Sequence, residues 1–434
     1  MPTTGIASTG TDFIGATGAL KEVYDKPFEN NIEGESEVWS ALEKTDGFEL
    51  TDQDGDGKGI KINHTFSYGG GVYAMSESDY FGQSSLPSTT QSTTTIPTIS
   101  ATVQMSGRLM RRMQGDKVAF ANWADELLPK RAKRVAFHLD RMSLGTGTGI
   151  IGRISGAPTG TNDVLAAAFG IAGLEGAGNL ILRGDVLRYS PNADGSAPRV
   201  GAATVSQKPI GTTGVFSVDA LPAAAANNDY VALGDANVLS FGKEIMGLEG
   251  IIDDGTNLAT IQNLARATFG EMKAQIIDST SAQFGATLSE EVIDFADSQA
   301  FEQGDGGAPN LLLVNRSGNR SFWKSLKADR QITDPRGSYT GGRAKLEMLV
   351  GDRMVKIVPA RKVPLSRAYG IDTRAIKRAD IGPGGWVNTT GAVFKQVSDA
   401  TGYKDAYVAH YIKETQLITY DPAMCYKITG LAAS

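Results

Sequence analysis

The residues best placed to do chemistry are the three aspartates of the run TDQDGDGKG: Asp52, Asp54 and Asp56. A helix-flanked calcium loop needs oxygen ligands at its first, third and fifth positions, glycine at the sixth and a bidentate glutamate at the twelfth. Gly57 fits the sixth position, but the twelfth is Asn63, which has no carboxylate. The residues after the run alternate apolar and polar side chains, as a strand does. We predict a solvated turn that leads into a strand, and the three aspartates stay a weak candidate for a cation site.

Other motifs that could carry chemistry lack the context that their chemistry needs. Residues 147–152, GTGIIG, have the glycine spacing of a dinucleotide fingerprint, but the sequence predicts a helix before them and none after them. The histidines do not lie at metal-ligand spacing with one another: His64, His138 and His410. The single cysteine, Cys425, excludes disulfides and paired-cysteine zinc sites, and its apolar neighbours predict a core position. We therefore predict no catalytic residue, no cofactor and no enzyme activity.

The composition is that of a folded protein with a modest negative charge. The chain has 434 residues, a net charge of -6, 41% hydrophobic and 21% charged residues, and a pI near 5.3. This length suits two or three domains, and the acidic balance argues against a protein whose main task is gripping nucleic acid. We expect the basic cluster KRAKR at 130–134 to be mostly solvated or paired. Without a visible secretory signal or an apolar run of membrane-spanning length, the expectation is a protein made in the cytoplasm.

Residues 59–106 predict a long two-stranded β hairpin with a broad, irregular tip. The return leg, IPTISATVQMSG, is rich in residues that favour strands. No Lys or Arg lies between Lys61 and Arg108, so the edges of this ribbon are poorly protected against pairing. Because a two-stranded ribbon is marginal alone in water, we expect a neighbouring copy of the chain to cover it. The expected inter-subunit contacts are aromatic and large apolar residues: Tyr68, Tyr73, Met75, Tyr80, Phe81 and Leu86.

The rest of the chain predicts a mixture of helices and strands. Residues 1–34 are rich in glycine, threonine and serine and predict an extended arm, followed by a short helix over 35–44. A long amphipathic helix ends at Gly145. Residues 150–255 predict a β-rich region with short strands. After this region, a capping box at Thr287–Glu290 predicts the start of another helix, and the C-terminal segments predict mainly strands.

The order of these elements resembles the major capsid protein of tailed bacteriophages, which has the Hong Kong 97-like fold. The long helix with its glycine-rich exit, residues 115–149, is similar to the spine helix of that family. Residues 350–431 are similar to its closing strands, with an aromatic-x-Pro pattern at Tyr420–Pro422 before the last strand. The segment GLEGIIDDGT at 247–256 resembles members that carry a β insertion. The resemblance covers most of residues 30–434.

The resemblance implies an α+β fold in six consecutive parts. They are an N-terminal arm at 1–58, an extended β-hairpin loop at 59–112, the spine helix of a peripheral domain at 113–150, a β-rich insertion at 151–255, a mixed α/β axial domain at 256–375, and closing strands of the peripheral and axial domains at 376–434. In some relatives a lysine of the extended loop forms an isopeptide crosslink with an asparagine on another subunit. Here the loop has only Lys61, at its base, so we predict that this crosslink is absent.

The resemblance also implies a function, that of a structural virion protein serving as the major capsid (head) subunit. Copies of the chain would form pentamers and hexamers of an icosahedral shell, which encloses double-stranded phage DNA without sequence-specific binding. Because only 58 residues precede the ribbon, we expect a separate scaffolding protein. A portal is a further expected partner, and a decoration protein is left open. Assembly is expected in the cytoplasm of the host bacterium and the finished protein in the virion, with no membrane partner.

Two other functions stay open at the level of the sequence. An encapsulin-like compartment shell would share the fold and enclose enzymes in place of DNA. A calcium-dependent binding module would depend on the acidic run alone. Closed particles in electron micrographs would separate both kinds of shell from the binding module, and nuclease treatment of the particles would distinguish packaged DNA from packaged protein.

Overall fold

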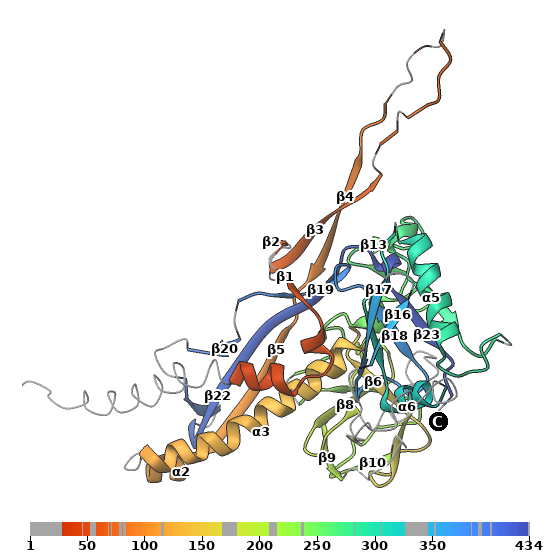
Figure 1. The fold of residues 1–434 in the computed structure, drawn as a ribbon. Coiled ribbons are helices and arrows are strands. Elements are labelled where there is room, and N and C mark those ends of the chain that lie inside the picture. Colours follow the sequence, from red (N-terminus) through yellow and green to blue (C-terminus); the bar gives the residue numbers. More distant parts are fainter. Residues whose placement is uncertain are drawn as a thin grey trace, which may run out of the picture.

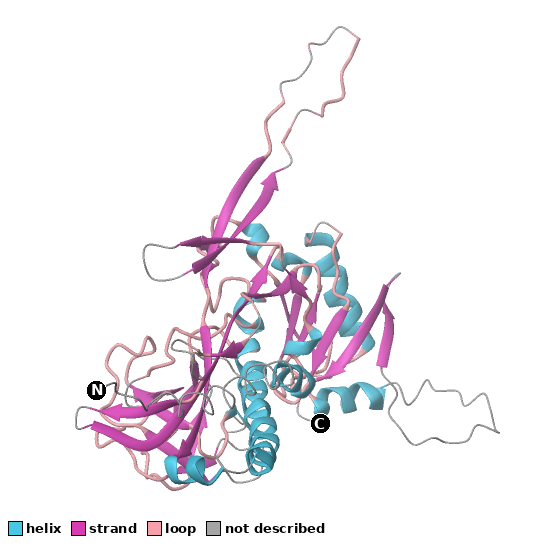
Figure 2. Ribbon diagram, turned by 90° about the vertical axis from the view of Figure 1, so that its left-hand side faces the viewer, coloured by secondary structure: helices cyan, strands magenta, loops and turns pink. Residues whose placement is uncertain are grey.

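The structure is a computed structural model that describes most of the 434 residues. The described residues are 28–45, 47–52, 58–67, 69–70, 72–77, 80, 84–113, 117–166, 180–207, 215–235, 238–281, 283–304, 306–325, 346–350, 353–382, 384–388, 393–399 and 402–432. They form an α+β body from which one long β hairpin projects (Figure 1 and Figure 2). None of the described helices combines the length and the apolarity that crossing a membrane would need.

One part of the body is a six-stranded mixed sheet with two helices. Its strands, in spatial order, are β14 (Gln275–Asp278), β23 (Tyr426–Thr429), β18 (Ala368–Ile371), β15 (Leu311–Val314), β17 (Arg353–Pro359) and β16 (Leu346–Val350). The helices are α5 (Glu290–Gln303) and α6 (Arg316–Ser325). Every position of β15 is buried, as its sequence LLLV predicts. The buried face of α5 packs against this sheet through Val292 and Ala296.

The start of α5 differs from the predicted capping box. The helix begins at Glu290, and its N-cap is Ser289, whose hydroxyl accepts the Val292 N–H at 3.4 Å. The expected N-cap, Thr287, instead directs its hydroxyl to the Phe284 carbonyl at 3.5 Å. Leu288 is buried in the core, and the backbone at Ser289 is still extended. Burial of Leu288 therefore moves the cap two residues along the chain.

A second sheet is organised around one long strand, β22 (Gly402–Thr419). The strands β21 (Lys395–Asp399), β20 (Gly385–Trp386), β19 (Ile376–Asp380) and β5 (Thr98–Ser106) all pair with it in antiparallel fashion. A short strand, β1 (Lys44–Thr45), pairs with β19 in parallel. Buried and less buried residues alternate along the middle of β22, as expected for a strand with one face on the core.

The projecting hairpin is shorter than the predicted ribbon of residues 59–106. Its legs are β3 (Lys58–Ser67) and β4 (Ser88–Thr95), which pair in antiparallel register, and β2 (Glu49–Asp52) adds a third strand at the root. The return leg leaves the hairpin at Ile96 and Pro97 and continues as β5 in the β22 sheet. Val103 and Met105 explain this difference, because both are buried in the core of the same chain. Strand β5 is therefore part of the body, and its own subunit covers the face that carries Val103 and Met105.

The long helix is α3 (Lys117–Ser143), preceded by the short helix α2 (Gly107–Met113). Its buried residues recur at three- and four-residue steps and face the largest core: Leu128, Ala132, Val135, Ala136 and Leu139. The helix ends where predicted, with the Gly145 N–H bonded to the Met142 carbonyl at 3.0 Å. The glycine-rich exit then requires glycine at Gly149, where φ is +74° and a Cβ atom would meet the Ser240 carbonyl oxygen at 2.1 Å.

In the described residues before β1, the structure differs from the sequence prediction, whereas residues 1–27 of the predicted arm lie outside the described residues. Residues 28–35 are helical rather than extended, and a 3-10 turn, η1 (Trp39–Ala41), replaces the expected helix over 35–44. Asp140 of α3 accounts for this change, because its carboxylate accepts the backbone N–H groups of residues 37, 38 and 39 at 2.9, 3.1 and 3.1 Å. Those donors are satisfied by a distant side chain instead of a continuing helix.

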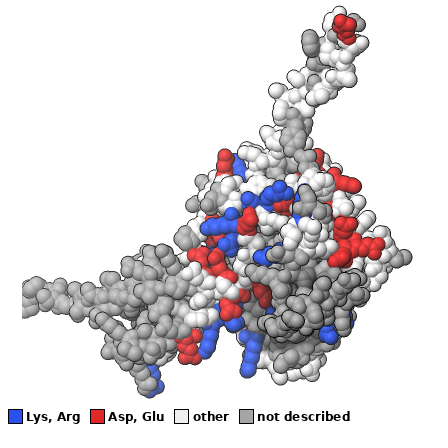
Figure 3. Space-filling view, viewed as in Figure 1, with Lys and Arg blue, Asp and Glu red and all other residues white. Residues whose placement is uncertain are grey.

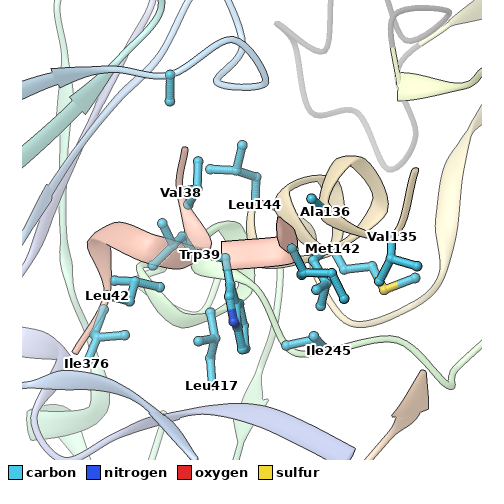
Figure 4. Packing of buried hydrophobic residues seen from close by; sticks show 14 of the residues in the cluster. Val38, Trp39, Leu42, Val135, Ala136, Met142, Leu144, Ile245, Ile376 and Leu417 are labelled. Atoms are coloured by element: carbon cyan, nitrogen blue, oxygen red, sulfur yellow. The ribbon is translucent and has the colours of Figure 1, made fainter. Parts of the chain in front are cut away.

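Trp39 anchors this segment in the core. Its side chain is fully buried, together with Val38 and Leu42. Figure 4 shows Trp39 between Leu417 of β22 and Ile245, with residues of α3 alongside. Burying Asp140 raises the pKa of its carboxyl group, while the three N–H donors act in the opposite direction. The chain before β1 is thus held to the body by both apolar packing and a buried carboxylate.

Six strands that lie between residues 150 and 233 form a closed barrel. Its strands are β6 (Ile150–Ile154), β7 (Asp163–Ala166), β8 (Val186–Ser190), β9 (Ala203–Gln207), β10 (Val215–Val218) and β11 (Tyr230–Leu233). Around the barrel they follow the order β10-β7-β6-β11-β8-β9. Leu187, Tyr189, Phe216 and Val231 fill a core that belongs to the barrel alone. The β-rich character of this region follows the sequence prediction, and closure leaves no free strand edge among these six strands.

A buried charge network joins the chain after the barrel to the six-stranded sheet. Glu249 of α4 (Leu248–Ile251) accepts the Lys427 ammonium group at 2.9 Å and the Tyr369 hydroxyl at 2.6 Å. Asp253 lies 3.7 Å from Lys427 and 3.4 Å from Arg266. Burial raises the pKa of Tyr369 well above its usual value. The remaining short elements are β12 (Thr260–Ile261), β13 (Leu264–Ala265), η3 (Gly270–Met272) and η4 (Pro422–Met424).

Candidate assembly interface

The root of the hairpin is fixed to the body by a small apolar cluster. Ile60 and Ile62 of β3 are buried against Ala379 of β19 and Ile418 of β22. These two isoleucines lie two residues apart, so they share one face of the strand. The apolar face of the alternating strand after the acidic run therefore packs into the core of its own chain. Contacts within one subunit fix the position of the root.

A buried hydrogen-bonded group holds the same root. His64 Nδ1 lies 3.0 Å from the Tyr420 carbonyl oxygen, and Nε2 lies 2.7 Å from Ser92 Oγ. A carbonyl only accepts, so Nδ1 carries the proton and Nε2 accepts from the Ser92 hydroxyl. Gln262 completes the group. Its side-chain amide nitrogen donates to Ser92 Oγ at 3.3 Å and to the Thr419 carbonyl at 3.0 Å. Burial lowers the pKa of His64, and its bond to Tyr420 partly opposes that shift.

The two legs stay connected beyond the ladder at Gly70 and Ser85. The Ser85 N–H donates to the Gly70 carbonyl at 3.2 Å, and the Gly70 N–H donates to Ser85 Oγ at 2.6 Å. The preceding Gly69 has φ +85°, and a Cβ atom there would lie 2.4 Å from the Ser85 carbonyl oxygen. Only glycine suits this position. The chain beyond it is carried away from the body to the tip seen in Figure 1.

The tip presents large apolar side chains to solvent. Of the predicted contact residues, Tyr73, Met75, Tyr80 and Leu86 are 60%, 43%, 97% and 88% exposed. Tyr68 and Phe81 lie outside the described residues. Sequence reasoning missed Val72, which is 100% exposed; its position next to Tyr73, after three glycines, was the available signal. Apolar residues gathered on a projecting segment are typical of a surface that binds another molecule.

The acidic run lies between two strands and not between two helices. Asp52 is the last residue of β2, and its register partner is Lys58, the first residue of β3. Asp54 and Asp56 lie outside the described residues. The strand predicted after the run is observed. In the described part of the chain, no group of three or more His, Cys, Asp or Glu side chains is arranged to hold a metal ion.

The other singled-out side chains have structural roles. His138 bonds Asp185 at 3.2 Å, and the Thr102 hydroxyl bonds His410 at 3.1 Å. Cys425 is buried, which raises the pKa of its thiol.

Within the basic cluster, three charges have acidic partners, as predicted. Lys130 pairs with Glu126 at 2.6 Å, Lys133 with Glu35 at 3.1 Å, and Arg134 with Asp185. Arg131 is the fourth charge of this cluster.

Comparisons with known proteins give similarity only at the level of structure. No family model matches the sequence, and no curated protein matches it. The chain is similar to the cyanophage A-1(L) capsid asymmetric unit, with a TM-score of 0.48 and 9% identity over 86% of this chain and 88% of that chain. It is similar to a structure from mycobacterium phage Adephagia, with a TM-score of 0.40 and 11% identity over 91% and 89%.

An encapsulin complex is similar over a smaller part of the chain. For the holo-SrpI encapsulin complex from Synechococcus elongatus PCC 7942, the TM-score is 0.24 and the identity 8%, over 37% of this chain and 54% of that chain. At these identities, no residue role passes from those proteins to this chain.

Proposed function

We propose that this chain is a shell-forming subunit, the major capsid protein of a tailed bacteriophage. The observation that carries the proposal is the hairpin, whose root is buried in its own subunit while its tip exposes Val72, Tyr80 and Leu86. Figure 3 shows this tip standing clear of the body in a space-filling view. The resemblance in element order described above supports the same function. In this proposal, the tip lies on a neighbouring copy and has no role in catalysis.

The exposed tip has a physical reason to bind another copy. Burying one large apolar side chain contributes about 1.5–3 kcal/mol relative to leaving it in water. One hairpin therefore supplies a weak contact, and a closed shell repeats it in every subunit, so that many weak contacts together hold the particle. Rings of identical subunits require head-to-tail contacts between two different surfaces. A projecting tip on one copy and a fixed surface on the next satisfy this requirement.

The finer assignments belong to the same proposal. The six-stranded mixed sheet is the axial domain, α3 is the spine of the peripheral domain, and the barrel is the insertion. The expected partners are a scaffolding protein, a portal and double-stranded DNA, with a decoration protein left open. Pentamers and hexamers would assemble in the host cytoplasm and end in the virion. The net charge of -6 supports a shell that encloses DNA without binding it strongly, because both carry negative charge.

Electron microscopy of the purified full chain tests the proposal. We expect closed particles or capsomers, from the chain alone or after co-expression with a scaffolding protein. A monodisperse monomer under both conditions would contradict it. Nuclease treatment and protein staining of the particles then identify the contents: packaged DNA supports the capsid, whereas packaged enzyme without DNA favours a compartment shell. Calcium titration by calorimetry is the corresponding test of a calcium-dependent module.

A further inference from the structure

The barrel is joined to the rest of the body by two connectors that run side by side. The chain enters the barrel from α3 through residues 144–149 and returns through residues 238–247. Figure 1 shows the barrel next to the C-terminal end of α3. The Gly242 N–H donates to the Thr148 carbonyl at 2.8 Å and so ties the two connectors together. Because both connections pass through one place, the barrel can turn about that place without stretching either connector.

Each connector contains a glycine whose backbone suits a hinge. Gly147 in the first and Gly242 in the second have φ of +79° and +67°, a region that other residues rarely adopt. Among the described residues, no heavy atom lies within 4 Å of the point where a Cβ atom at Gly242 would be, so the backbone there has room to move. A hinge is usually made of a few loop residues that absorb a change in φ and ψ. The two connectors meet that description.

The seam between the barrel and the body is loosely packed. The barrel has a core of its own, separate from the core that α3 borders. A cavity of about 40 Å3 lies between Ile151 of β6 and Arg367 of the body. A groove of about 410 Å3 lies between residues 98–102, α3 and residues 238–244, and Leu233 of β11 also lines it. Since protein interiors contain few such spaces, this seam offers little apolar packing to hold the barrel in place.

A buried carboxylate of the barrel fastens it to α3 across this seam. Asp185 lies just before β8, and its side chain is 2% exposed. Arg134 of α3 pairs with one oxygen of this carboxylate, and His138 Nε2, one helical turn further on, lies 3.2 Å from the same oxygen. The other oxygen accepts the Leu182 N–H at 2.6 Å, which fixes the carboxylate within its own module. Asp185 therefore joins two parts whose apolar cores are separate.

Asp185 is ionised at this position. Burial acts to raise the pKa of its carboxyl group, but the bond to His138 and the charge of Arg134 outweigh burial, so the pKa lies below its ordinary value. Burial lowers the pKa of His138, so its imidazole is neutral at pH 7 and donates through Nε2. The contact across the seam is therefore an ion pair with Arg134 and, beside it, a hydrogen bond from a neutral histidine.

We propose that the barrel is a hinged module, held in one orientation by a latch in which Asp185 binds Arg134 and His138 of α3. When the latch opens, the barrel turns as a unit about the two connectors, and the core of the body stays as it is. This inference stands apart from the proposed shell-forming function, because it can be measured on the free chain whether or not particles form. In a shell, such a device would let subunits in unequal surroundings differ in the barrel while their bodies stay the same.

Distances between two spin labels, measured by pulsed electron paramagnetic resonance, test the latch directly. The only native cysteine is buried, so labels react at engineered cysteines. Val200→Cys places one label on the barrel and Tyr403→Cys places the other on β22, at positions that are 90% and 81% exposed. We expect a narrow distance distribution with the latch intact and one about twice as broad when Arg134→Met or Asp185→Asn is added. Dilution with unlabelled chain restricts the signal to distances within one chain.

Two controls separate an open latch from a damaged fold. Lys133→Met removes the exposed charge next to Arg134, whose acidic partner lies outside the barrel, and should leave the barrel distance unchanged. Labels at Leu349→Cys and Tyr403→Cys both lie outside the barrel and should keep a narrow distribution in every variant. If Asp185→Asn broadens this second pair as well, Arg134→Met decides, because it changes no barrel residue. A barrel distance that Arg134→Met leaves unchanged, or that is already as broad with the latch intact, would overturn the inference.

A conservative variant distinguishes charge from packing. Arg134→Lys keeps the positive charge but loses the planar, two-pronged guanidinium group. We expect a distance distribution of intermediate width, between those of the wild-type chain and Arg134→Met. A width equal to that of Arg134→Met would show that the charge of Arg134 does not hold the barrel, and the latch would have to be abandoned.

Discussion

The barrel at 150–233 and the hairpin at 58–95 are both built from short antiparallel strands, yet only the barrel is complete within one chain. The barrel closes on itself and buries Phe216 and Leu187 in its own core. The hairpin is covered only at its root, where Ile60 and Ile62 reach the body. A closed sheet needs no partner for its edges, whereas an open two-stranded ribbon does. The comparison separates a self-contained module from a segment whose tip its own chain leaves exposed.

The sequences of the two regions explain the difference. Barrel strands carry large inward-facing side chains, such as Tyr189 on β8 and Val231 on β11. Strand β4 of the hairpin reads STTQSTTT, and Ser92 is its buried position. Threonine and serine form strands readily but bury little apolar area. The hairpin is therefore shaped as a strand without the apolar surface that would fold it back on its own body.

The largest effect on stability is expected inside the barrel. Phe216→Ala should lower the free energy of unfolding of the barrel by about 3–5 kcal/mol, because it removes a fully buried aromatic ring and leaves a cavity. Hydrogen exchange of the barrel amides measures the loss. Val200→Ala, at a 90% exposed position, is the matched control and should change stability by less than about 0.5 kcal/mol. If Phe216→Ala also loosened the hairpin root, the two regions would not be independent.

A smaller effect is expected at the hairpin root. Ile62→Ala should lower the free energy of unfolding of the root by about 2 kcal/mol. This is the lower end of the range for a buried isoleucine, because the root cluster is small. The loss should appear as faster hydrogen exchange in β3 and β4. Asn63→Ala changes the next residue, which is exposed, and should have little effect. Equal exchange in both variants would show that the isoleucines do not hold the root.

Acid should weaken the root through His64. Its pKa in the folded chain is lowered below 6.5, so the unfolded state binds the extra proton first as the pH falls. The stability that the neutral imidazole contributes is therefore complete above pH 6.5 and is lost as the pH falls below that value. The free energy of unfolding, measured with urea at several pH values, should show this decline. The variant His64→Asn should have a shallower dependence of that free energy on pH. His138, whose pKa burial also lowers, should supply the remaining slope. An unchanged slope in His64→Asn would contradict this assignment.

The smallest effect on stability is expected at the tip, together with a clear effect on assembly. Tyr80→Ser combined with Leu86→Ser should leave the unfolding free energy of the monomer within about 0.5 kcal/mol, since both side chains are exposed. The fraction of protein in particles, measured by sedimentation, should fall sharply. Ser84→Ala in the same leg is the matched control. Normal assembly of the double variant would remove the tip from the interface.

Local sequence patterns predicted many elements of this fold. The periodicity of Leu127, Val135 and Leu139 predicted α3, and the run LLLV predicted β15. Alternation after Gly59 predicted β3 as the outgoing leg of a hairpin. These signals are local because each depends on residues within one or two turns, or within one strand. The exposed tip residues were predicted on the same basis, and their contacts with another copy stay a prediction.

Contacts between distant parts of the chain explain what the sequence did not predict. Asp140 caps a segment about one hundred residues earlier and ends the expected helix there. Strand β5 leaves the ribbon for β22, which lies some three hundred residues later. Barrel closure depends on β9 meeting β10 with the other strands in order. The groove lined by residues 98–102, by α3 and by residues 238–244 also combines distant parts of the chain, so no single stretch of sequence contains it.

The short link between β4 and β5 has a mechanical consequence. Only Ile96 and Pro97 separate the hairpin from a strand that makes nine register pairs with β22. Figure 1 shows the hairpin and β5 running in nearly the same direction. Tension applied at the tip would therefore load that ladder in shear, and its hydrogen bonds would have to yield together instead of opening one after another. A wall built from such subunits would pass stretching forces from copy to copy along β22, through the most extensively paired strand of each.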